Sequence, residues 1–248
     1  MDLAEKRRFY GSMVFPAILL LLLWAIKILE VAFQTSFSEF GLLPQSFSGL
    51  RGILFSPLLH SDWKHLSANS VPLFLLSAGL FYYYGKKAWT IFVLCWLVTG
   101  LWVWIFANDM AVHIGASGVV YALATFHFTG GLLRREPRMM AFSLLVVFLY
   151  GGLVWGVIPD FLPEKNISWE SHLLGGLAGI LIAYAYRGEG PQRKVYQWND
   201  EEEEDMEFID EDPPPAEENP GDSNPVKTEN AVNELKVNYI YKETKKEE

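Results

Sequence analysis

Two residues that can form a hydrolytic pair lie in short polar segments far apart in the chain. Ser117 belongs to the segment 115–118, G-A-S-G, and His172 belongs to the segment 171–176, S-H-L-L-G-G. A serine hydroxyl is a weak nucleophile until a base such as an imidazole takes its proton. The two residues are therefore candidates for nucleophile and general base, provided that the fold brings them together.

A third polar segment supplies hydrogen-bond donors. It covers residues 60–69, H-S-D-W-K-H-L-S-A-N, in which His65 and Asn69 are four residues apart and share one face of a helix. Both side chains can donate to an oxyanion that forms on a substrate carbonyl. The backbone N–H groups at the start of a helix beginning near Ser117 would point the same way.

Small residues would let the helices that carry these side chains approach closely. Two stripes occur at four-residue spacing: Gly175 with Gly179, and Gly118 with Ala122. The first stripe lies near the face of His172, and the second lies beside Ser117 and Tyr121. Close packing of the two helices would bring serine and histidine within hydrogen-bond reach.

Each polar residue also has a purely structural interpretation. Serine is a common N-cap, a histidine within a helix often bonds to a backbone carbonyl, and Asn69 could bond across helices. In the same way we expect His60 to be structural, His113 to be interfacial and His127 to pack or line a cavity. The elements that carry the three segments decide between these interpretations.

Six apolar stretches must position these side chains. The chain has 248 residues, of which 51% are hydrophobic, and many cluster in runs of about the 20 residues that a bilayer-crossing helix needs. The stretches are residues 9–33, 65–84, 88–107, 112–133, 139–158 and 169–186. This pattern predicts an all-α, polytopic membrane protein with a bundle of six transmembrane helices. A soluble enzyme, a disulfide-stapled secreted domain and a nucleic-acid binder are all disfavoured.

The first connection, residues 34–59, differs from a solvated linker. It is rich in Phe, Leu, Ser, Gly and Pro and has few charges, so we expect it to lie in the membrane interface. Lys27 and Glu30, near the end of the first span, can snorkel or pair across one helical turn.

The distribution of basic residues orients the spans. Eleven lie before the first span, after the last, or in the even-numbered connections, against three in the other connections, or four if Lys27 is counted. The positive-inside rule then places both termini of a multi-pass protein in the cytoplasm. The alternative for the first span is a signal peptide, with residues 6–8 as its charged region, but no clear small-residue cleavage site follows.

The second, fourth and sixth spans therefore run from the outside inward. All three polar segments stand at the start of one of these spans, so they share one shallow depth near the outer face. Polar side chains inside a span are costly and mark functional sites by default. Their coincidence at one depth favours a single site over three unrelated structural roles.

The overall net charge of −9 conceals two regions. Residues 188–248 carry 19 acidic and 7 basic side chains, whereas residues 1–187 are net positive. We therefore expect a membrane domain over residues 1–187 and an acidic, disordered cytoplasmic tail over residues 188–248. The tail could be a solubilising appendage or could dock an unknown cytoplasmic partner.

Over residues 10–187 the chain resembles the rhomboid intramembrane serine proteases, in their six-span bacterial form, which implies a location in the bacterial inner membrane. The match is carried by His60, His65 and Asn69 in the pattern H-x4-H-x3-N, by residues 115–122, G-A-S-G-V-V-Y-A, and by His172 with Gly175, Gly176 and Gly179. The resemblance implies that Ser117 is the nucleophile and His172 the general base. It makes His65 and Asn69 oxyanion-hole residues, helped by the Ser117 amide, and Tyr121 a ring packed on His172. The glycines at 115, 118, 175 and 179 support the site.

The resemblance implies a dyad without a carboxylate, a cofactor or a metal ion. Glu170 is two residues from His172, so on a helix it points elsewhere, and the zinc-protease pattern H-E-x-x-H is absent. One departure lies in the first connection, where the family often has Trp-Arg and this chain has Leu50-Arg51-Gly52. Arg51 is expected to substitute in part for that anchor.

The implied activity is hydrolysis of peptide bonds in or near the transmembrane segments of protein substrates, with the lipid bilayer as the other partner and no nucleic acid. One alternative is an inactive relative that binds transmembrane helices for quality control or trafficking, although such relatives typically lack the serine or the histidine. The other is a transporter, which the absence of a charged relay across the midplane argues against.

Overall fold

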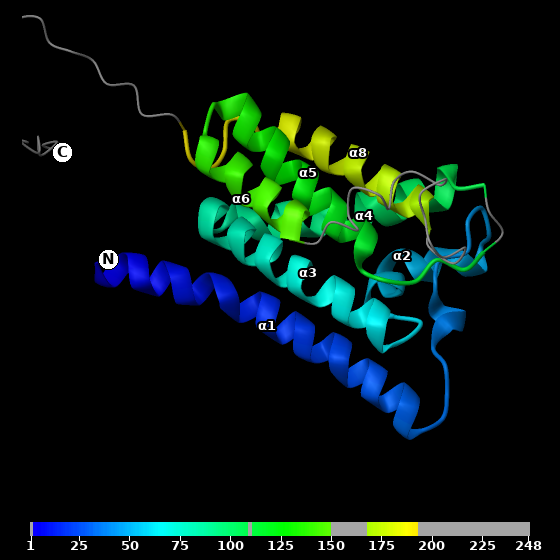
Figure 1. The fold of residues 1–248 in the computed structure, drawn as a ribbon. Helices are drawn as coiled ribbons and strands as arrows, with labels where there is room; N and C mark the ends of the chain where they lie inside the picture. The colour runs from blue at the N-terminus through cyan, green and yellow to red at the C-terminus, as the bar shows by residue number, and fades with distance from the viewer. Residues whose placement is uncertain (1, 109–110, 150–167, 193–248) are drawn as a thin grey trace, which may run out of the picture. The chain divides into compact units, whose positions relative to one another are not determined.

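The computed structural model describes residues 2–108, 111–149 and 168–192, all within one compact unit, Met1–Tyr196. Its long helices are α1 Leu3–Ala32, α3 Trp63–Tyr84, α4 Lys87–Phe106, α5 Ser117–Arg134, α6 Pro137–Leu149 and α8 Trp169–Ala185 (Figure 1). The described residues contain no β-strand and one isolated bridge, between Leu42 and His113. The predicted all-α class is confirmed for this part of the chain.

Three of these helices, α1, α3 and α4, are long and apolar enough to cross a membrane. Large apolar side chains on them point outward, for example Leu21 at 71% exposure. A water-soluble fold would not leave so much apolar surface uncovered, whereas a bilayer solvates it. The other long helices do not meet that test over their described residues, and the predicted end of the fifth span, near Ile158, lies outside them.

The segment between α1 and α3 forms a series of short helical turns. They are η1 Ser38–Phe40, η2 Ser48–Arg51, α2 Gly52–Phe55 and η3 Ser56–Leu58. A Cβ on Gly52 would lie 2.2 Å from the Leu42 backbone, so these turns pack too tightly for a larger residue. The indole of Trp104 on α4 donates to the Ser46 carbonyl at 2.8 Å, which ties the segment to the helices.

Arg51 anchors this first connection from within. Its guanidinium donates to the Glu39 carbonyl at 2.7 Å and covers the ring of Phe40 at 4.7 Å from the centroid. At the end of α1, Lys27 and Glu30 form the ion pair expected from their spacing, at 3.1 Å. Lys27 also donates to the His60 carbonyl at 3.0 Å, so the pair joins α1 to the segment that precedes α3.

Helix α5 packs most closely against α8, which lies beside it in Figure 1. A Cβ on Gly175 would stand 2.2 Å from the Gly118 carbonyl oxygen, and one on Gly179 would stand 2.0 Å from that of Ala122. Only glycine allows backbones to come this close. The two small-residue stripes therefore meet each other across the α5–α8 interface.

Buried Arg134 joins the C-terminal ends of three helices. It donates to the Tyr84 hydroxyl of α3 and to the carbonyls of Tyr186 and Glu189, at 3.1 and 2.7 Å, just after α8. Since the first turns of these helices also meet, as described below, α3, α5 and α8 run in the same direction. At 1.5 Å per residue, the four candidate site residues lie about 21 to 28 Å from these ends along their helices.

Two predicted starts differ from the structure: α1 begins at Leu3, six residues before the predicted start of the first span, and the fourth span begins later than predicted. Hydropathy placed the start of the fourth span near Val112, but α5 begins at Ser117. Gly115 has a φ of +114°, which a helix cannot accommodate, and its N–H bonds to the Ser56 carbonyl at 2.8 Å. The apolar residues before Ser117 therefore belong to a loop held against the first connection.

Candidate active site

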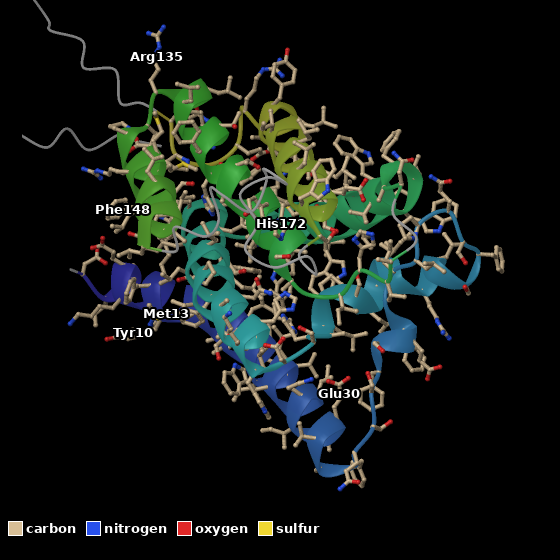
Figure 2. The ribbon with its side chains drawn as sticks, turned by 45° about the vertical axis from the view of Figure 1, so that its right-hand side comes forward. Tyr10, Met13, Glu30, Arg135, Phe148 and His172 are labelled. Atoms are coloured by element: carbon tan, nitrogen blue, oxygen red, sulfur yellow. The ribbon has the colours of Figure 1, made fainter. Side chains whose placement is uncertain are left out.

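The structure brings Ser117 and His172 together across the α5–α8 interface. The Nε2 atom of His172 lies 2.9 Å from the Ser117 hydroxyl oxygen. Ser117 is the first residue of α5 and His172 lies in the first turn of α8, where Figure 2 shows it among the helices. Only 7% of His172 is exposed. This distance allows the imidazole to accept the hydroxyl proton.

The Tyr121 ring holds the imidazole from one side. It stacks on His172 with ring centroids 4.3 Å apart and planes 20° apart. Tyr121 follows Ser117 by one helical turn, so both lie on the face of α5 that meets α8. A stacked ring restricts rotation of the imidazole and keeps its edge toward Ser117.

The spacing of the helices at the dyad is set by backbone contacts. A Cβ on Gly118 would stand 3.2 Å from the Ser171 carbonyl oxygen, and one on Gly175 would clash with Gly118 itself. One turn beyond His172 on α8, the Gly176 carbonyl accepts a hydrogen bond from the Thr125 hydroxyl of α5 at 2.8 Å. These contacts fix α8 against α5 on either side of His172.

His65 and Asn69 lie against the loop that precedes Ser117. A Cβ on Gly115 would stand 2.7 Å from His65 Nε2 and 3.6 Å from Asn69 Nδ2. The amide nitrogen of Asn69 is buried and has no hydrogen-bond partner among the described residues. A buried donor without an acceptor is costly unless a ligand supplies one. The position is suitable for binding an oxyanion.

His60 holds the loop that precedes Ser117 by a hydrogen bond. Its Nε2 atom accepts a hydrogen bond from the Ala116 N–H at 3.4 Å, and its ring centroid lies 5.0 Å from that of His65. Burial, together with the neighbouring imidazole of His65, lowers the pKa of His60 from 6.5 to about 3. His60 is therefore neutral near pH 7 and can act as the acceptor.

Asp62 starts the helix that carries the donors. It is the N-cap of α3, and its carboxylate accepts from the His65 N–H at 2.9 Å. Hydrogen bonds from the Ser61 hydroxyl and the His65 N–H lower the pKa of this carboxyl. The Ser61 hydroxyl oxygen also lies 3.2 Å from His65 Nδ1, which orients the imidazole.

The Glu170 carboxylate is engaged elsewhere. Its Oε1 atom accepts from the Asn108 N–H at 3.1 Å, as expected for a side chain that points away from His172. In the described ranges no three His, Cys, Asp or Glu side chains are grouped so that they could hold a metal ion.

One group of polar residues at the site was not predicted. His113, expected only to be interfacial, is buried, and its Nδ1 atom lies within hydrogen-bond distance of the hydroxyls of Ser168 and Ser171. Ser168 is the N-cap of α8. The Ser-x-x-Ser pattern at a helix start indicates a cap, but nothing in the sequence pairs it with a histidine 55 residues away.

Comparison with known proteins identifies the class to which this fold and site belong. A family profile described as the Rhomboid domain matches residues 48–189. This range contains all four candidate catalytic residues and more than half of the chain. The chain belongs to the rhomboid family, which confirms the resemblance seen in its motifs, and it is an integral membrane protein.

Individual relatives agree with this assignment. An uncharacterized protein of Mycobacterium tuberculosis is 32% identical over 184 residues, which cover 70% of this chain and 74% of the relative. An uncharacterized protein of Mycobacterium leprae is 30% identical over the same length, with 70% of each chain covered. The YdcA protein of Bacillus subtilis, named as a candidate rhomboid protease, is 27% identical over 128 residues, 51% of this chain and 62% of its own.

Proposed function

We propose that this protein is an intramembrane serine protease that hydrolyses peptide bonds in or near the transmembrane segments of other proteins, with a Ser–His dyad and no cofactor or metal ion. The observation that carries the proposal is the 2.9 Å separation of Ser117 Oγ and His172 Nε2. The proposed nucleophile starts a helix, so the N–H groups of its first turn are available to a developing anion.

The reaction follows from the positions of these atoms. Ser117 Oγ attacks the substrate carbonyl carbon while its proton passes to His172 Nε2. The negative oxygen accepts hydrogen bonds from Asn69, His65 and the Ser117 amide. As the C–N bond breaks, His172 returns the proton to the leaving amine. Water then attacks the carbonyl carbon of the acyl-enzyme and gives a proton to His172. As the bond between this carbon and Ser117 Oγ breaks, His172 returns the proton to Oγ.

The proposal extends to the arrangement of the chain in the membrane. We expect a six-span bundle over residues 1–187, an interfacial first connection, and both termini in the cytoplasm of a bacterial cell. The common direction of α3, α5 and α8 supports this topology, because it requires each connection between them to cross the membrane again. The acidic residues 188–248 would then form a cytoplasmic tail, free to meet a cytoplasmic partner.

The substrates that fit this site are single-span membrane proteins. A peptide bond can reach Ser117 only in extended form, because a helix hides its carbonyls in intrahelical hydrogen bonds. Transmembrane segments with small or helix-weakening residues near the outer face are therefore the expected targets.

The experiment is cleavage of a model single-span substrate in detergent by the wild type and by Ser117→Ala. The matched control is Ser143→Ala, which removes another buried serine hydroxyl, one that donates to the Ala124 carbonyl at 2.8 Å. We expect cleavage by the wild type and by Ser143→Ala, and none by Ser117→Ala. Equal cleavage by all three proteins would contradict the proposal, and no cleavage by any would favour a protein that only binds transmembrane helices.

A further inference from the structure

His113 lies in the loop that precedes Ser117 and contacts the start of α8, the helix that carries His172. It precedes Ser117 by four residues, and its backbone pairs with the first connection through the Leu42 carbonyl at 2.8 Å and the Leu42 N–H at 3.0 Å. The backbone of His113 is thus fixed just before the turn at Gly115 that leads into α5.

The side chain of His113 contacts the start of α8, next to His172. Its Nδ1 atom lies 3.0 Å from the Ser171 hydroxyl oxygen and within hydrogen-bond distance of the Ser168 hydroxyl. The Ser168 hydroxyl donates to that of Ser171 at 2.7 Å, and its oxygen accepts from the Ser171 N–H at 3.3 Å. Ser171 directly precedes His172. One imidazole therefore contacts both the N-cap serine, Ser168, and the residue whose N–H it caps, Ser171, in the helix that carries the proposed base.

We propose that His113 is a positioning residue that fixes the first turn of α8, and with it His172, relative to Ser117. This inference rests on the proposed function. It addresses a specific feature of the site: Ser117 and His172 both lie in first helical turns, where the leading N–H groups have no intrahelical acceptor. In α8 the His172 N–H makes a long bond, of 3.4 Å, to the Ser168 carbonyl. His113 is bonded through its backbone on the Ser117 side and through its ring on the His172 side.

The position of Ser171 makes the coupling direct. Its carbonyl oxygen lies 3.2 Å from the point where a Cβ on Gly118 would stand, so Ser171 is enclosed between the α5 backbone and the His113 ring. Loss of the ring removes the contact with Ser168 and Ser171 and leaves the first turn of α8 held by the α5 backbone, the Tyr121 ring and the Glu170–Asn108 hydrogen bond. Misplacement of a catalytic group by about 1 Å can cost roughly 100-fold in rate.

The kinetic test compares His113→Ala with His127→Ala. His127 is another buried histidine, whose Nε2 atom lies 3.0 Å from the Leu76 carbonyl oxygen, about 15 Å along α5 from Ser117. We expect His113→Ala to lower kcat by about 10- to 100-fold with KM within about twofold. His113→Gln, which keeps a hydrogen-bonding group, should recover part of the loss. Equal effects of the two alanine variants on kcat, at matched Tm, would overturn the proposal.

A second measurement does not depend on proteolysis. In a Ser117→Cys background, the imidazole of His172 should promote thiolate formation, and iodoacetamide alkylation at pH 6.5 should be fast. Cys95 is fully buried and should not compete. We expect His113→Ala to slow alkylation by about three- to tenfold, and His172→Ala to set the slow limit.

The outcomes separate the two proposals. Alkylation that is unchanged by His113→Ala, or that does not depend on His172, overturns the positioning role. A wild type that neither cleaves a substrate nor reacts with a serine probe, while alkylation still depends on both histidines, contradicts the proposed protease function and leaves the positioning role intact.

Discussion

At the scale of single residues, the polar side chains of the candidate site are held by hydrogen bonds and ring contacts with their neighbours. The imidazole of His172 is stacked on Tyr121, and the loop before Ser117 is held by the neutral imidazole of His60. Polar groups of this kind are costly inside a membrane protein unless each has a partner. The Asn69 amide nitrogen and His60 Nδ1 both lack a partner among the described residues. Of the two, the Asn69 amide lies beside Gly115, in the loop that leads to Ser117, where the proposed oxyanion would supply the acceptor.

Replacing Asn69 by alanine tests this explanation. We expect Asn69→Ala to lower kcat by about 10²- to 10³-fold with little change in KM, because the donor acts mainly on the oxyanion. The control is Ser77→Ala, a fully buried position on the same helix two turns further inward. A rise in KM with unchanged kcat would show that Asn69 binds substrate and does not stabilise the intermediate.

His60 predicts how stability depends on pH. Its pKa is about 3 in the folded protein and 6.5 when unperturbed, so between these values the unfolded chain binds a proton that the folded chain does not. The free energy of unfolding should therefore fall as pH falls from 6.5 towards 3, by up to about 1.4 kcal/mol per unit.

Thermal unfolding of the wild type and of His60→Gln across this range isolates the effect. Glutamine can accept the Ala116 N–H bond but does not titrate. The Tm of the wild type should drop more steeply below pH 6.5 than that of His60→Gln. Parallel curves would mean that another group dominates the acid sensitivity.

At the scale of helices, the dyad depends on how closely α5 and α8 approach. The backbones of α5 and α8 touch at Gly175 and Gly179 of α8, one turn apart, and Thr125 of α5 adds a hydrogen bond beside them. Between them lies Gly176, where a Cβ would meet, among the described residues, only the Thr125 methyl group, at 3.6 Å. The two adjacent glycines Gly175 and Gly176 therefore provide a matched pair.

Gly175→Ala should separate the helices, because its Cβ would stand 2.2 Å from a carbonyl oxygen that cannot rotate away. We expect a loss of about 1 to 3 kcal/mol in stability together with a large loss of kcat. Gly176→Ala should be neutral or stabilising, since alanine favours a helix by up to about 1 kcal/mol over glycine. Thermal unfolding and substrate cleavage measure both effects, and indistinguishable variants would contradict this account of the interface.

Sequence reasoning reached some parts of this arrangement and missed others for physical reasons. Glycine spacing at 118, 175 and 179 predicts a helix contact because the period of a helix is local information. The start of α5 was misplaced because hydropathy does not register the positive φ of Gly115. The contact of His113 with Ser168 and Ser171 depends on how the loop before Ser117 packs against the start of α8, and no local pattern encodes it.

At the scale of the whole molecule, charge and apolar surface together support the proposed arrangement of the chain in a membrane. The outward-facing side chains of α1, α3 and α4 include large apolar residues. Four basic residues lie close to helix ends on the side of Arg134: Lys86 and Lys87 between α3 and α4, and Arg135 and Arg138 at the junction of α5 and α6. Basic residues at helix ends favour the cytoplasmic side. The candidate site lies at the opposite ends of α3, α5 and α8.

Labelling of single cysteines in intact cells tests this orientation. Phe47 is 90% exposed in the first connection, and Arg138 is exposed near the start of α6. A membrane-impermeant maleimide should label Phe47→Cys directly and Arg138→Cys only after the cells are permeabilised. The reverse pattern would place the site on the cytoplasmic side and contradict the proposed topology.

The central claim is that Ser117 is a nucleophile activated by His172. Its most direct test is mass-spectrometric mapping of the adduct formed when the full chain, in detergent micelles, reacts with a fluorophosphonate probe. The account predicts a single adduct on the peptide containing Ser117, and loss of that adduct in His172→Ala. An adduct on a different serine, or labelling of Ser117 that is unaffected by His172→Ala, would contradict it.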